Sequence, residues 1–284
     1  MPTKTANGRI HAKRKSWRRA FVGEQLADEP SPLHPPGITM KSFFKAVFIA
    51  ASCGIILLAA LPAAAQQRGW PVATNDESGF VPIFDGKTLA GWEGDPQYWR
   101  VENGALVGEV TPTNLLKVNS FIVWRGGEPR DFELKVEYRI SDKGNSGINY
   151  RSVMATNFGP WAMRGYQADI DGRNQYTGQN YEEKGRTFLA LRGQVTRQVN
   201  DQLPQIIGSL GTTNELLAAI KNDDWNEYHL IVTGNTLTHI LNGRVMSVVI
   251  DEDAKNRKLG SGRLFAHAKS IYETIRRCQA RIKA

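Results

Sequence analysis

Residues 145–151 read NSGINYR and residues 165–171 read GYQADID, two runs in which apolar residues alternate with amide, guanidinium and carboxylate groups. Successive side chains of a β-strand point to opposite faces of its sheet, so this alternation predicts two half-buried strands. The apolar face of the second run holds Tyr166, Ala168 and Ile170. The polar face, if the two strands lie close together, holds Asn149, Arg151, Gln167, Asp169 and Asp171.

This polar face has two interpretations. Polar residues at alternate positions are typical of any solvated sheet face. Two acids at a spacing of two, such as Asp169 and Asp171, repel each other unless a cation, a metal or a shared proton compensates. Planar amide, guanidinium and carboxylate groups also form the hydrogen bonds that sugar hydroxyls require. The pattern therefore favours a carbohydrate site without identifying one.

Residues 80–262 show the same kind of element along most of their length. Short strand-like runs recur with turn residues between them, at Phe80–Phe84, Trp99–Val101, Ala105–Val107, Ser120–Trp124, Phe132–Ile140, Gly147–Val153, Tyr166–Ile170, Thr187–Leu191 and Gln194–Val199. This density of strands, without an internal repeat, predicts one all-β sandwich domain.

The last part of this domain gives the clearest strand signal. Three runs, Glu227–Val232, Leu237–Leu241 and Val245–Ile250, are joined by Gly234-Asn235 and Asn242-Gly243. Both dipeptides tolerate the positive φ angles of two-residue hairpin turns. The runs therefore predict a meander of three antiparallel strands.

Two segments of the body are not strand-like. Residues 213–220 predict a short surface helix, for which Thr212 or Thr213 can serve as the N-cap. Residues 173–185 have no period and mix tyrosine, amide and carboxylate groups, including Tyr181. A long loop of this kind is either functional, with a composition that suits contact with a sugar, or a solvated surface loop.

The N-terminal region predicts export. A positive start at residues 40–45 is followed by an apolar run at 46–61 and by three alanines before Gln66. This is the pattern of a secretory signal peptide over residues 40–65, with translation starting at Met40. A retained membrane anchor is the alternative, but the apolar run is broken by residues 52–54, stops at Pro62 and has no basic stop-transfer flank. We expect a periplasmic or secreted protein with no stable membrane anchor after cleavage.

Charge is distributed unevenly along the chain. The net charge is +8, yet residues 66–253 hold 18 basic and 24 acidic side chains, a net charge of −6. A basic arm can bind nucleic acid, but we expect the basic extension at residues 1–39 to be disordered or non-native, because a signal peptide follows it. Residues 66–79 are interpreted as a linker. The acidic body argues against a nucleic-acid partner and suits a small carbohydrate substrate, neutral or assisted by a cation.

Six motifs occur in order between Gly79 and Gly243. They are FDGKTLAGW at 84–92, WRVENGAL at 99–106, DFEL at 131–134, NSGI at 145–148, GYQ at 165–167 and WN at 225–226. This series resembles the secreted 3-keto-disaccharide hydrolase domain family, formerly a domain of unknown function. The resemblance implies a concanavalin-like jelly-roll β-sandwich of antiparallel strands with one short helix.

The resemblance also implies cleavage of 3-keto-glycosides. A ketone at C3 of a sugar acidifies the hydrogen at C2, so a base can remove it. The C1 aglycone then leaves by β-elimination, and addition of water gives net hydrolysis. Such a site needs a general base and a positive or hydrogen-donating group at the ketone oxygen. The alternative function is a carbohydrate-binding module or lectin, which the same sandwich architecture also supports.

The candidate site residues follow from this chemistry, and no motif-level rule chooses among the acids. The candidate catalytic residues are Asp169, Asp171, Glu182 and Arg151, with Glu183 as a further acid. The candidate substrate-binding residues are Asn149, Arg164, Tyr166, Gln167 and Tyr181. Arg151, Arg164 or a divalent cation can stabilise the enolate, and the sequence does not identify ligands for a metal.

The chain departs from the family pattern after Gly260. Family members end with a strand carrying Gln-x-His and a final strand near Phe-Arg-Asn-Ile. Here residues 263–284 are interpreted as an atypical basic tail, and residues 270–278 predict a basic helix. A frameshift or a genuine tail would explain the difference. A missing closing strand would leave one edge of the sandwich exposed.

Overall fold

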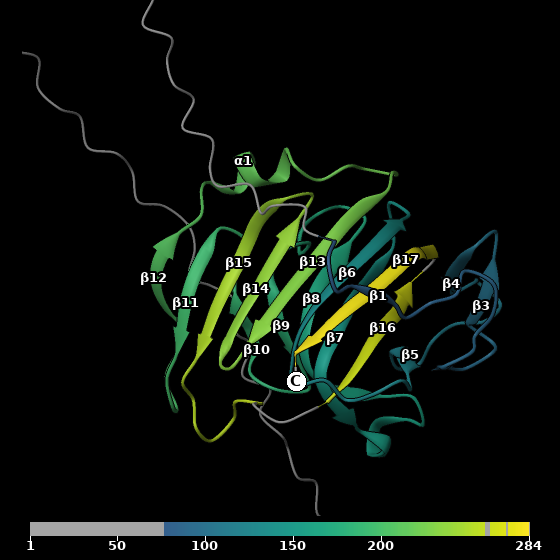
Figure 1. Cartoon of the computed structure of the whole chain (residues 1–284), viewed down its shortest axis with the longest axis horizontal. Coiled ribbons are helices and arrows are strands. Elements are labelled where there is room, and N and C mark those ends of the chain that lie inside the picture. Colours follow the sequence, from purple (N-terminus) through teal and green to yellow (C-terminus); the bar gives the residue numbers. More distant parts are fainter. Residues whose placement is uncertain (1–76, 259–261, 271, 284) are drawn as a thin grey trace, which may run out of the picture. The chain divides into compact units, whose positions relative to one another are not determined.

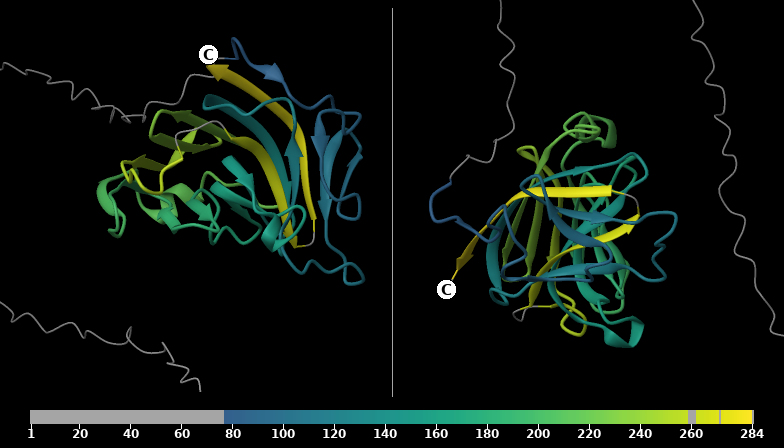
Figure 2. Two further views of the ribbon diagram at one scale, coloured as in Figure 1. Left: turned by 90° about the horizontal axis from the view of Figure 1, so that it is seen from below. Right: turned by 90° about the vertical axis from the view of Figure 1, so that its right-hand side faces the viewer.

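The computed structural model describes residues 77–258, 262–270 and 272–283. Its strands form two facing sheets, with the ten-stranded sheet in front in Figure 1 and further views of both layers in Figure 2. Strand β8 (Met163–Asp171) shows how the layers hold together, because Tyr166, Ala168 and Ile170 are all buried in the core. The all-β sandwich predicted from the alternation is confirmed.

The front sheet contains strands from both ends of the described chain. Its order is β12 (Gln205–Ser209), β11 (Gln194–Gln198), β15 (Arg244–Asp251), β14 (Thr236–Leu241), β13 (Asn226–Thr233), β6 (Asp131–Ile140), β17 (Tyr272–Lys283), β4 (Ala105–Glu109) and β3 (Trp99–Glu102), with β1 (Val81–Pro82) also paired to β17. Neighbouring strands are antiparallel except for β11 and β15, which are parallel.

The second sheet has seven strands. Its order is β10 (Thr187–Ala190), β9 (Asn180–Glu183), β8, β7 (Asn145–Met154), β16 (Arg263–Ser270), β5 (Ser120–Trp124) and β2 (Trp92–Glu93). Its neighbouring strands pair in the antiparallel sense. A short 3-10 helix, η1 (Thr156–Phe158), follows β7.

Aromatic side chains from both sheets fill the space between the layers. Phe132 of the ten-stranded sheet meets Tyr150 of the seven-stranded sheet edge to face, with ring centroids 6.1 Å apart. Tyr150 also lies 5.5 Å from Tyr166, and all three side chains are almost completely buried. Burial of each such side chain contributes roughly 1.5–3 kcal/mol, so this contact contributes strongly to the association of the sheets.

The meander and the helix are confirmed. Strands β13, β14 and β15 pair in sequence, and Gly234, Asn242 and Gly243 in their turns have positive φ angles of 55°, 48° and 77°. The helix α1 (Thr213–Leu217) is shorter than expected. Thr212 is its N-cap and forms a reciprocal capping box with Glu215.

The prediction of a basic helix at residues 270–278 is wrong. Residues 263–270 and 272–283 are strands β16 and β17, so the sandwich continues through the segment interpreted as a tail. The register of β17 against β6 shifts between Ile275 and Arg277, which breaks the alternation of buried and exposed residues. Because Ile275 and Cys278 are both buried at a spacing of three, the sequence around this bulge resembles a helical pattern.

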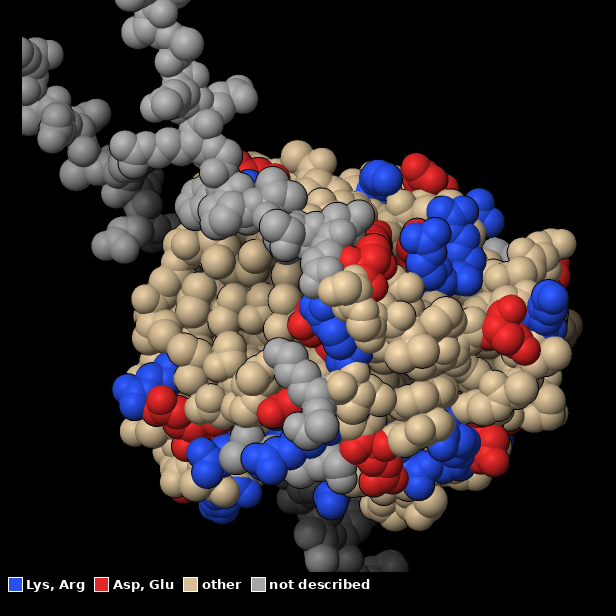
Figure 3. Space-filling view, in the orientation of Figure 1, with Lys and Arg blue, Asp and Glu red and all other residues tan. Residues whose placement is uncertain are grey.

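The positive charge of β17 is balanced by acids of the neighbouring strand. Arg276 and Arg277 both contact Glu137, at 2.5 and 3.1 Å, and Arg281 contacts Glu133 at 2.8 Å. Figure 3 shows basic and acidic side chains lying side by side on this face of the sheet. The basic residues at the end of the chain are therefore paired with acidic residues of β6, the strand beside β17.

Within the part of the chain that the structure describes, no helix is long and apolar enough to cross a membrane. The extension at 1–39, the signal peptide at 40–65 and nearly all of the linker at 66–79 lie outside the described residues.

Ending the chain after Ser270 should abolish folding, because β17 lies between β6 and β4 and its loss exposes both strand edges. Circular dichroism melts should show no cooperative transition for this truncation. A chain ending at Ile282, which keeps the buried part of β17, serves as the control and should melt as the wild type does. A cooperative melt of the shorter chain would contradict the central role of β17.

A buried histidine lies in the core between the sheets. His239 Nε2 lies 2.9 Å from the Tyr150 hydroxyl and 3.2 Å from the amide nitrogen of Asn180, and its Nδ1 lies 3.3 Å from the Tyr228 hydroxyl. Burial lowers the pKa of His239 to about 3. The imidazole therefore stays neutral in the folded protein at neutral pH.

The free energy of unfolding should fall as the pH is lowered, because His239 is buried in its neutral form. The folded pKa is depressed, so this contribution is complete above the unfolded pKa of about 6.5 and is lost as the pH falls toward 3. Between pH 7 and about pH 4.5 the loss should be about 2 kcal/mol. Urea unfolding at both pH values should show a smaller loss for His239→Gln. Equal losses in the two proteins would contradict this role.

Candidate functional site

The outer face of the seven-stranded sheet gathers four of the candidate residues. Gln167 and Asp169 alternate along β8 with the core residues, so they point away from the ten-stranded sheet. Asn149 is the register partner of Gln167 on β7, and Tyr181 is its partner on β9. These four positions therefore adjoin on one face, and we call them, together with Glu183, the amide face.

Gly147 of the NSG motif makes room for this arrangement. It is the register partner of Asp169, and a Cβ at this position would lie 2.7 Å from Cγ of Gln167. The Gln167 side chain therefore lies over Gly147, and its Nε2 donates a hydrogen bond to Oδ1 of Asp169. A glycine at 147 lets the amide reach the carboxylate.

Asn149 is the most unusual residue of the amide face. Its side chain is fully buried, yet neither Nδ2 nor Oδ1 has a hydrogen-bond partner among the described residues. Oε1 of Gln167 is buried and unpartnered in the same sense. Each such group costs about 1–3 kcal/mol when it is left unsatisfied. Unpaired donors and acceptors side by side indicate a place for a polar ligand or water.

Aromatic side chains border the amide face on the β9 and β10 side. The ring of Tyr181 lies 5.1 Å from that of Phe188, which in turn stacks on Tyr176 at 5.8 Å. Burial raises the pKa of Tyr181, and the nearby carboxylates of Glu183 and Asp169 raise it further. Tyr181 therefore stays a neutral hydroxyl between two acids.

Asp171, although it ends the same strand, has a different environment. Its carboxylate accepts hydrogen bonds from the backbone N–H groups of Gln175, Tyr176 and Thr177, at 3.0, 2.7 and 2.9 Å. It also accepts one from the Thr177 hydroxyl at 3.2 Å. Asp171 thus stabilises the turn after β8. The two acids of the GYQADID run therefore do not form a catalytic pair.

Arg151 does not lie on the polar face that the alternation predicts. The register of β7 shifts between Tyr150 and Val153, and Arg151 has a positive φ of 45°, so its side chain leaves the alternating pattern. The guanidinium bonds to Asp131 at 2.8 Å and to the carbonyl oxygens of Arg130, Gly234 and Lys258. It is almost completely buried and ties both sheets together.

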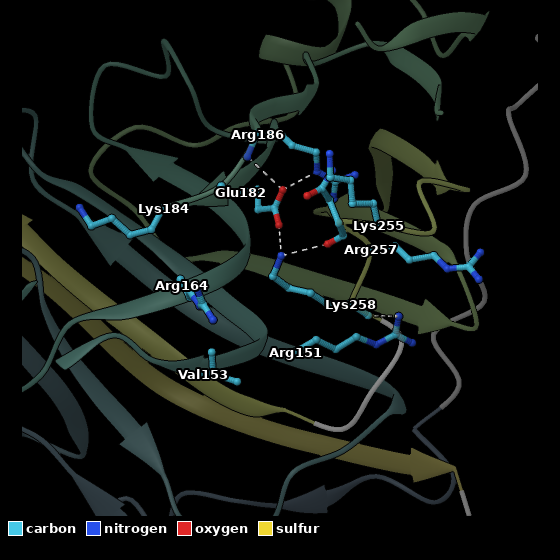
Figure 4. Close-up of a pocket in the computed structure, with 11 residues that line it drawn as sticks. Arg151, Val153, Arg164, Glu182, Lys184, Arg186, Lys255, Arg257 and Lys258 are labelled. Atoms are coloured by element: carbon cyan, nitrogen blue, oxygen red, sulfur yellow. Dashed lines mark hydrogen bonds and ion pairs between the residues drawn. The ribbon is translucent and has the colours of Figure 1, made fainter. Parts of the chain in front are cut away.

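Arg164 and Glu182, together with Arg151, line a cavity of about 660 Å³ (Figure 4). Strands β7, β8 and β9, the turn after β9 and the loop after β15 form its walls. The lining residues are Arg151, Val153, Arg164, Glu182, Lys184, Gly185, Arg186, Lys255, Asn256, Arg257 and Lys258. Because Glu182 and Glu183 are neighbours on a strand, one faces this cavity and the other faces the amide face.

Glu182 is held as an anion in this cavity. It is buried and accepts a hydrogen bond from Arg186 at 2.6 Å and another from the Lys258 ammonium group. Burial alone would raise the pKa of Glu182, but the hydrogen bonds from Arg186 and Lys258 outweigh it and leave the pKa below its ordinary value. Glu182 is therefore a weaker base than an isolated carboxylate.

Tyr166 belongs to the hydrogen-bond network beside this cavity and not to the amide face. Its hydroxyl donates to Oδ2 of Asp251 at 2.6 Å and accepts from the backbone N–H of Lys258 at 2.8 Å. Asp251 also forms two hydrogen bonds with Arg186, at 2.7 and 3.0 Å. This ion pair connects the β9–β10 turn with the end of β15.

Sequence reasoning missed several of these residues. The motif NSGI contains Gly147, but its role depends on a side chain that lies 20 positions later in the chain. The pairing of Arg186 with Asp251 spans 65 residues and carries no local signal. The sequence did carry a signal for Phe188. It is an aromatic residue in a predicted strand beside a tyrosine-rich loop, and such residues suit the wall of a sugar site.

The described residues contain no group of three or more His, Cys, Asp or Glu side chains placed to hold a metal ion.

The sequence of this chain is similar to those of known proteins. Residues 79–272 match the model of a family described as 3-keto-alpha-glucoside-1,2-lyase-like domain. A 3-keto-disaccharide hydrolase of Bacteroides thetaiotaomicron is 33% identical over 100 residues, which are 28% of this chain and 30% of that protein. The match thus spans less than a third of the relative's length.

Solved structures are also similar to this chain. A candidate glycosyl hydrolase of Parabacteroides distasonis has a TM-score of 0.51 and 19% identity, over 72% of this chain and 95% of that one. A second such protein from the same species has a TM-score of 0.47 and 14% identity, over 72% of this chain and 99% of that one. The first of these similarities supports the β-sandwich assignment and the fold alone.

Replacing Asp171 by alanine should destabilise the protein without removing a reacting group. Three backbone N–H donors of the 175–177 turn would lose their acceptor, which should lower the free energy of unfolding by about 2–3 kcal/mol. Urea denaturation measures this loss. Asp142→Ala, at an exposed aspartate, is the control and should change stability by about 0.5 kcal/mol or less. Equal effects of both changes would contradict the capping role.

Proposed function

We propose, because this chain belongs to the 3-keto-alpha-glucoside-1,2-lyase-like domain family, that it is a carbohydrate-active enzyme that cleaves 3-keto-glycosides at the amide face. The family match covers residues 79–272, which include every residue of that face. The name of the Bacteroides thetaiotaomicron relative supports a 3-keto-disaccharide as the substrate.

One observation supports the amide face as the site of the reaction. Asn149 and Gln167 present buried, unpartnered amide atoms directly beside the carboxylate of Asp169. A buried polar group without a partner is unfavourable in the free protein and becomes favourable when a ligand supplies the missing hydrogen bonds. A sugar with a ketone and several hydroxyls supplies both donors and acceptors.

Asp169 is the residue to which we assign proton abstraction. Its carboxylate takes the hydrogen at C2 of the sugar, and the electron pair of the C2–H bond moves toward C3, which places negative charge on the ketone oxygen. Nδ2 of Asn149 is a free donor and would stabilise that charge by a hydrogen bond. The Gln167 amide holds Asp169 in position.

Elimination and hydration complete the reaction. When the enolate returns to the ketone, its electron pair forms a C1–C2 double bond and the C1–O bond breaks. The aglycone oxygen takes the proton that Asp169 removed from C2, which restores the Asp169 carboxylate. Water then adds across the double bond, with oxygen at C1 and hydrogen at C2. The sum of both steps is hydrolysis. Tyr181 and Phe188 would provide an aromatic wall for the sugar ring.

The other candidates have supporting roles in this proposal. Arg151 and Asp171 use their polar atoms in internal hydrogen bonds, and Glu182 is paired with two cations. Glu183, at the border of the amide face, is the second acid able to act as the base. We also propose export to the periplasm or medium, on the strength of the signal-peptide pattern at residues 40–65.

Asp169→Asn should lower kcat on a chromogenic 3-keto-glucoside by about 10²–10⁴-fold, because the amide cannot accept the C2 proton. Release of the chromophore measures turnover, and circular dichroism confirms folding. Asp142→Asn, an exposed aspartate elsewhere, is the matched control and should keep full activity.

Two outcomes would overturn this assignment. A larger loss in Glu183→Gln than in Asp169→Asn would transfer the role of base to Glu183. Saturable binding of the keto sugar by the wild type, without release of the chromophore, would favour the carbohydrate-binding module over the enzyme.

A further inference from the structure

The cavity shown in Figure 4 has a charge distribution that the proposed reaction does not use. Seven of its lining residues are basic and only Glu182 is acidic. It opens on the face of β8 and β9 opposite to the amide face. From these features we propose that it is a second binding site, which takes an anionic sugar such as a sugar acid or a sugar phosphate.

The inner part of the cavity is electrically balanced. Arg186 pairs with Glu182 at 2.6 Å and with Asp251 at 2.7 Å, and it lies 3.4 Å from Asp253. Burial alone would lower the pKa of Arg186, but its hydrogen bonds to Asp251 and Glu182 raise it above the ordinary value. Lys258 shares Glu182. These groups neutralise one another and form a rigid floor.

The rim of the cavity is not balanced in this way. Arg164 and Arg257 have no carboxylate partner among the described residues, and Figure 4 places them on different sides of Glu182. Most arginines outside the cavity do have such a partner, as Arg100 and Arg125 illustrate. Two unpaired guanidinium groups at one cavity are an attractive site for an oxyanion, which each can bind through two parallel hydrogen bonds.

The two lysines of the rim differ in how firmly they are paired. The ammonium group of Lys184 lies 3.2 Å from Glu183, and that of Lys255 lies 3.2 Å from Asp201. The side chains of Lys255 and Asp201 are both about two-thirds exposed or more, at 66% and 73%. This exposed pair contributes little and exchanges readily with a competing anion. Lys255 is therefore available to a ligand, whereas Lys184 is held by the buried carboxylate of Glu183 and lies over the ring of Phe158.

The size of the cavity indicates more than an inorganic ion. Its volume of about 660 Å³ lies within the range of pockets that hold small organic ligands, and a single phosphate group would leave most of it empty. Val153, whose side chain is partly exposed, offers an apolar wall. Membership of a carbohydrate-active family favours a sugar as the neutral part of the ligand, and this choice does not depend on turnover at the amide face.

Isothermal titration calorimetry of the full chain with glucuronate and glucose 6-phosphate tests the proposal. Glucose and inorganic phosphate are the comparison ligands, and each is titrated at low and high salt. We expect both anionic sugars to bind saturably, glucose not to bind, and phosphate to bind more weakly than glucose 6-phosphate. Affinity should fall as salt rises, because salt screens exposed charges.

The double variant Arg164→Gln/Arg257→Gln should weaken binding of both anionic sugars by about tenfold or more, the effect of losing a charge-assisted hydrogen bond. Arg125→Gln/Arg173→Gln removes the same charge from exposed arginines outside the cavity and should leave the affinity unchanged. Arg173 follows the far end of β8 from Arg164, which makes it a suitable control.

Several results would overturn the proposal. They are no saturable binding of either anionic sugar, equal losses in the two double variants, or glucose binding as tightly as glucuronate. Phosphate binding as tightly as glucose 6-phosphate would rule out a sugar-specific site. Because the titrations contain no keto sugar, they give the same answer whether or not the chain cleaves 3-keto-glycosides, and an Asp169→Asn protein should bind the anions normally.

Discussion

The structure depends on the burial of both faces of strand β8. All of its residues except Arg164 are buried, although polar and apolar residues alternate along it. The apolar half packs between the sheets, where Tyr166 meets Tyr150. The polar half has lost most of its contact with water and needs partners within the protein or from a ligand. Asp171 finds them in a turn, whereas Gln167 finds only part of them.

The same constraint explains the ion pairs at one end of the sandwich. The β9–β10 turn of the seven-stranded sheet brings Arg186 against the buried carboxylates of Glu182 on β9 and of Asp251 at the end of β15 in the other sheet. A buried charge is tolerated only when it is paired and hydrogen-bonded. Removing one member would leave its partners unpaired, which costs about 3–5 kcal/mol. The network therefore fixes the β9–β10 turn, and with it the strand that carries Tyr181 and Glu183.

Much of the fold could be predicted from the sequence, and the failures have a common cause. Regular alternation predicted β8, and turn dipeptides predicted the meander β13–β15, because both signals are local. The two main errors, Arg151 and the basic helix, both occur at β-bulges, where one extra residue turns the following side chains to the other face. A bulge is set by pairing with a distant strand, so the local sequence does not show it.

The candidate site was harder to predict than the fold, since its polar residues differ from structural ones only in what surrounds them. Asp169 and Asp171 have the same chemistry and the same periodicity. They are separated by their contacts: Asp171 accepts three backbone hydrogen bonds, while Asp169 adjoins amide atoms that have none. Likewise, Glu182 and Glu183 are neighbours in sequence but face opposite sides of β9. The candidate site is therefore distinguished by unsatisfied hydrogen-bonding groups, a property that exists only after the chain has folded.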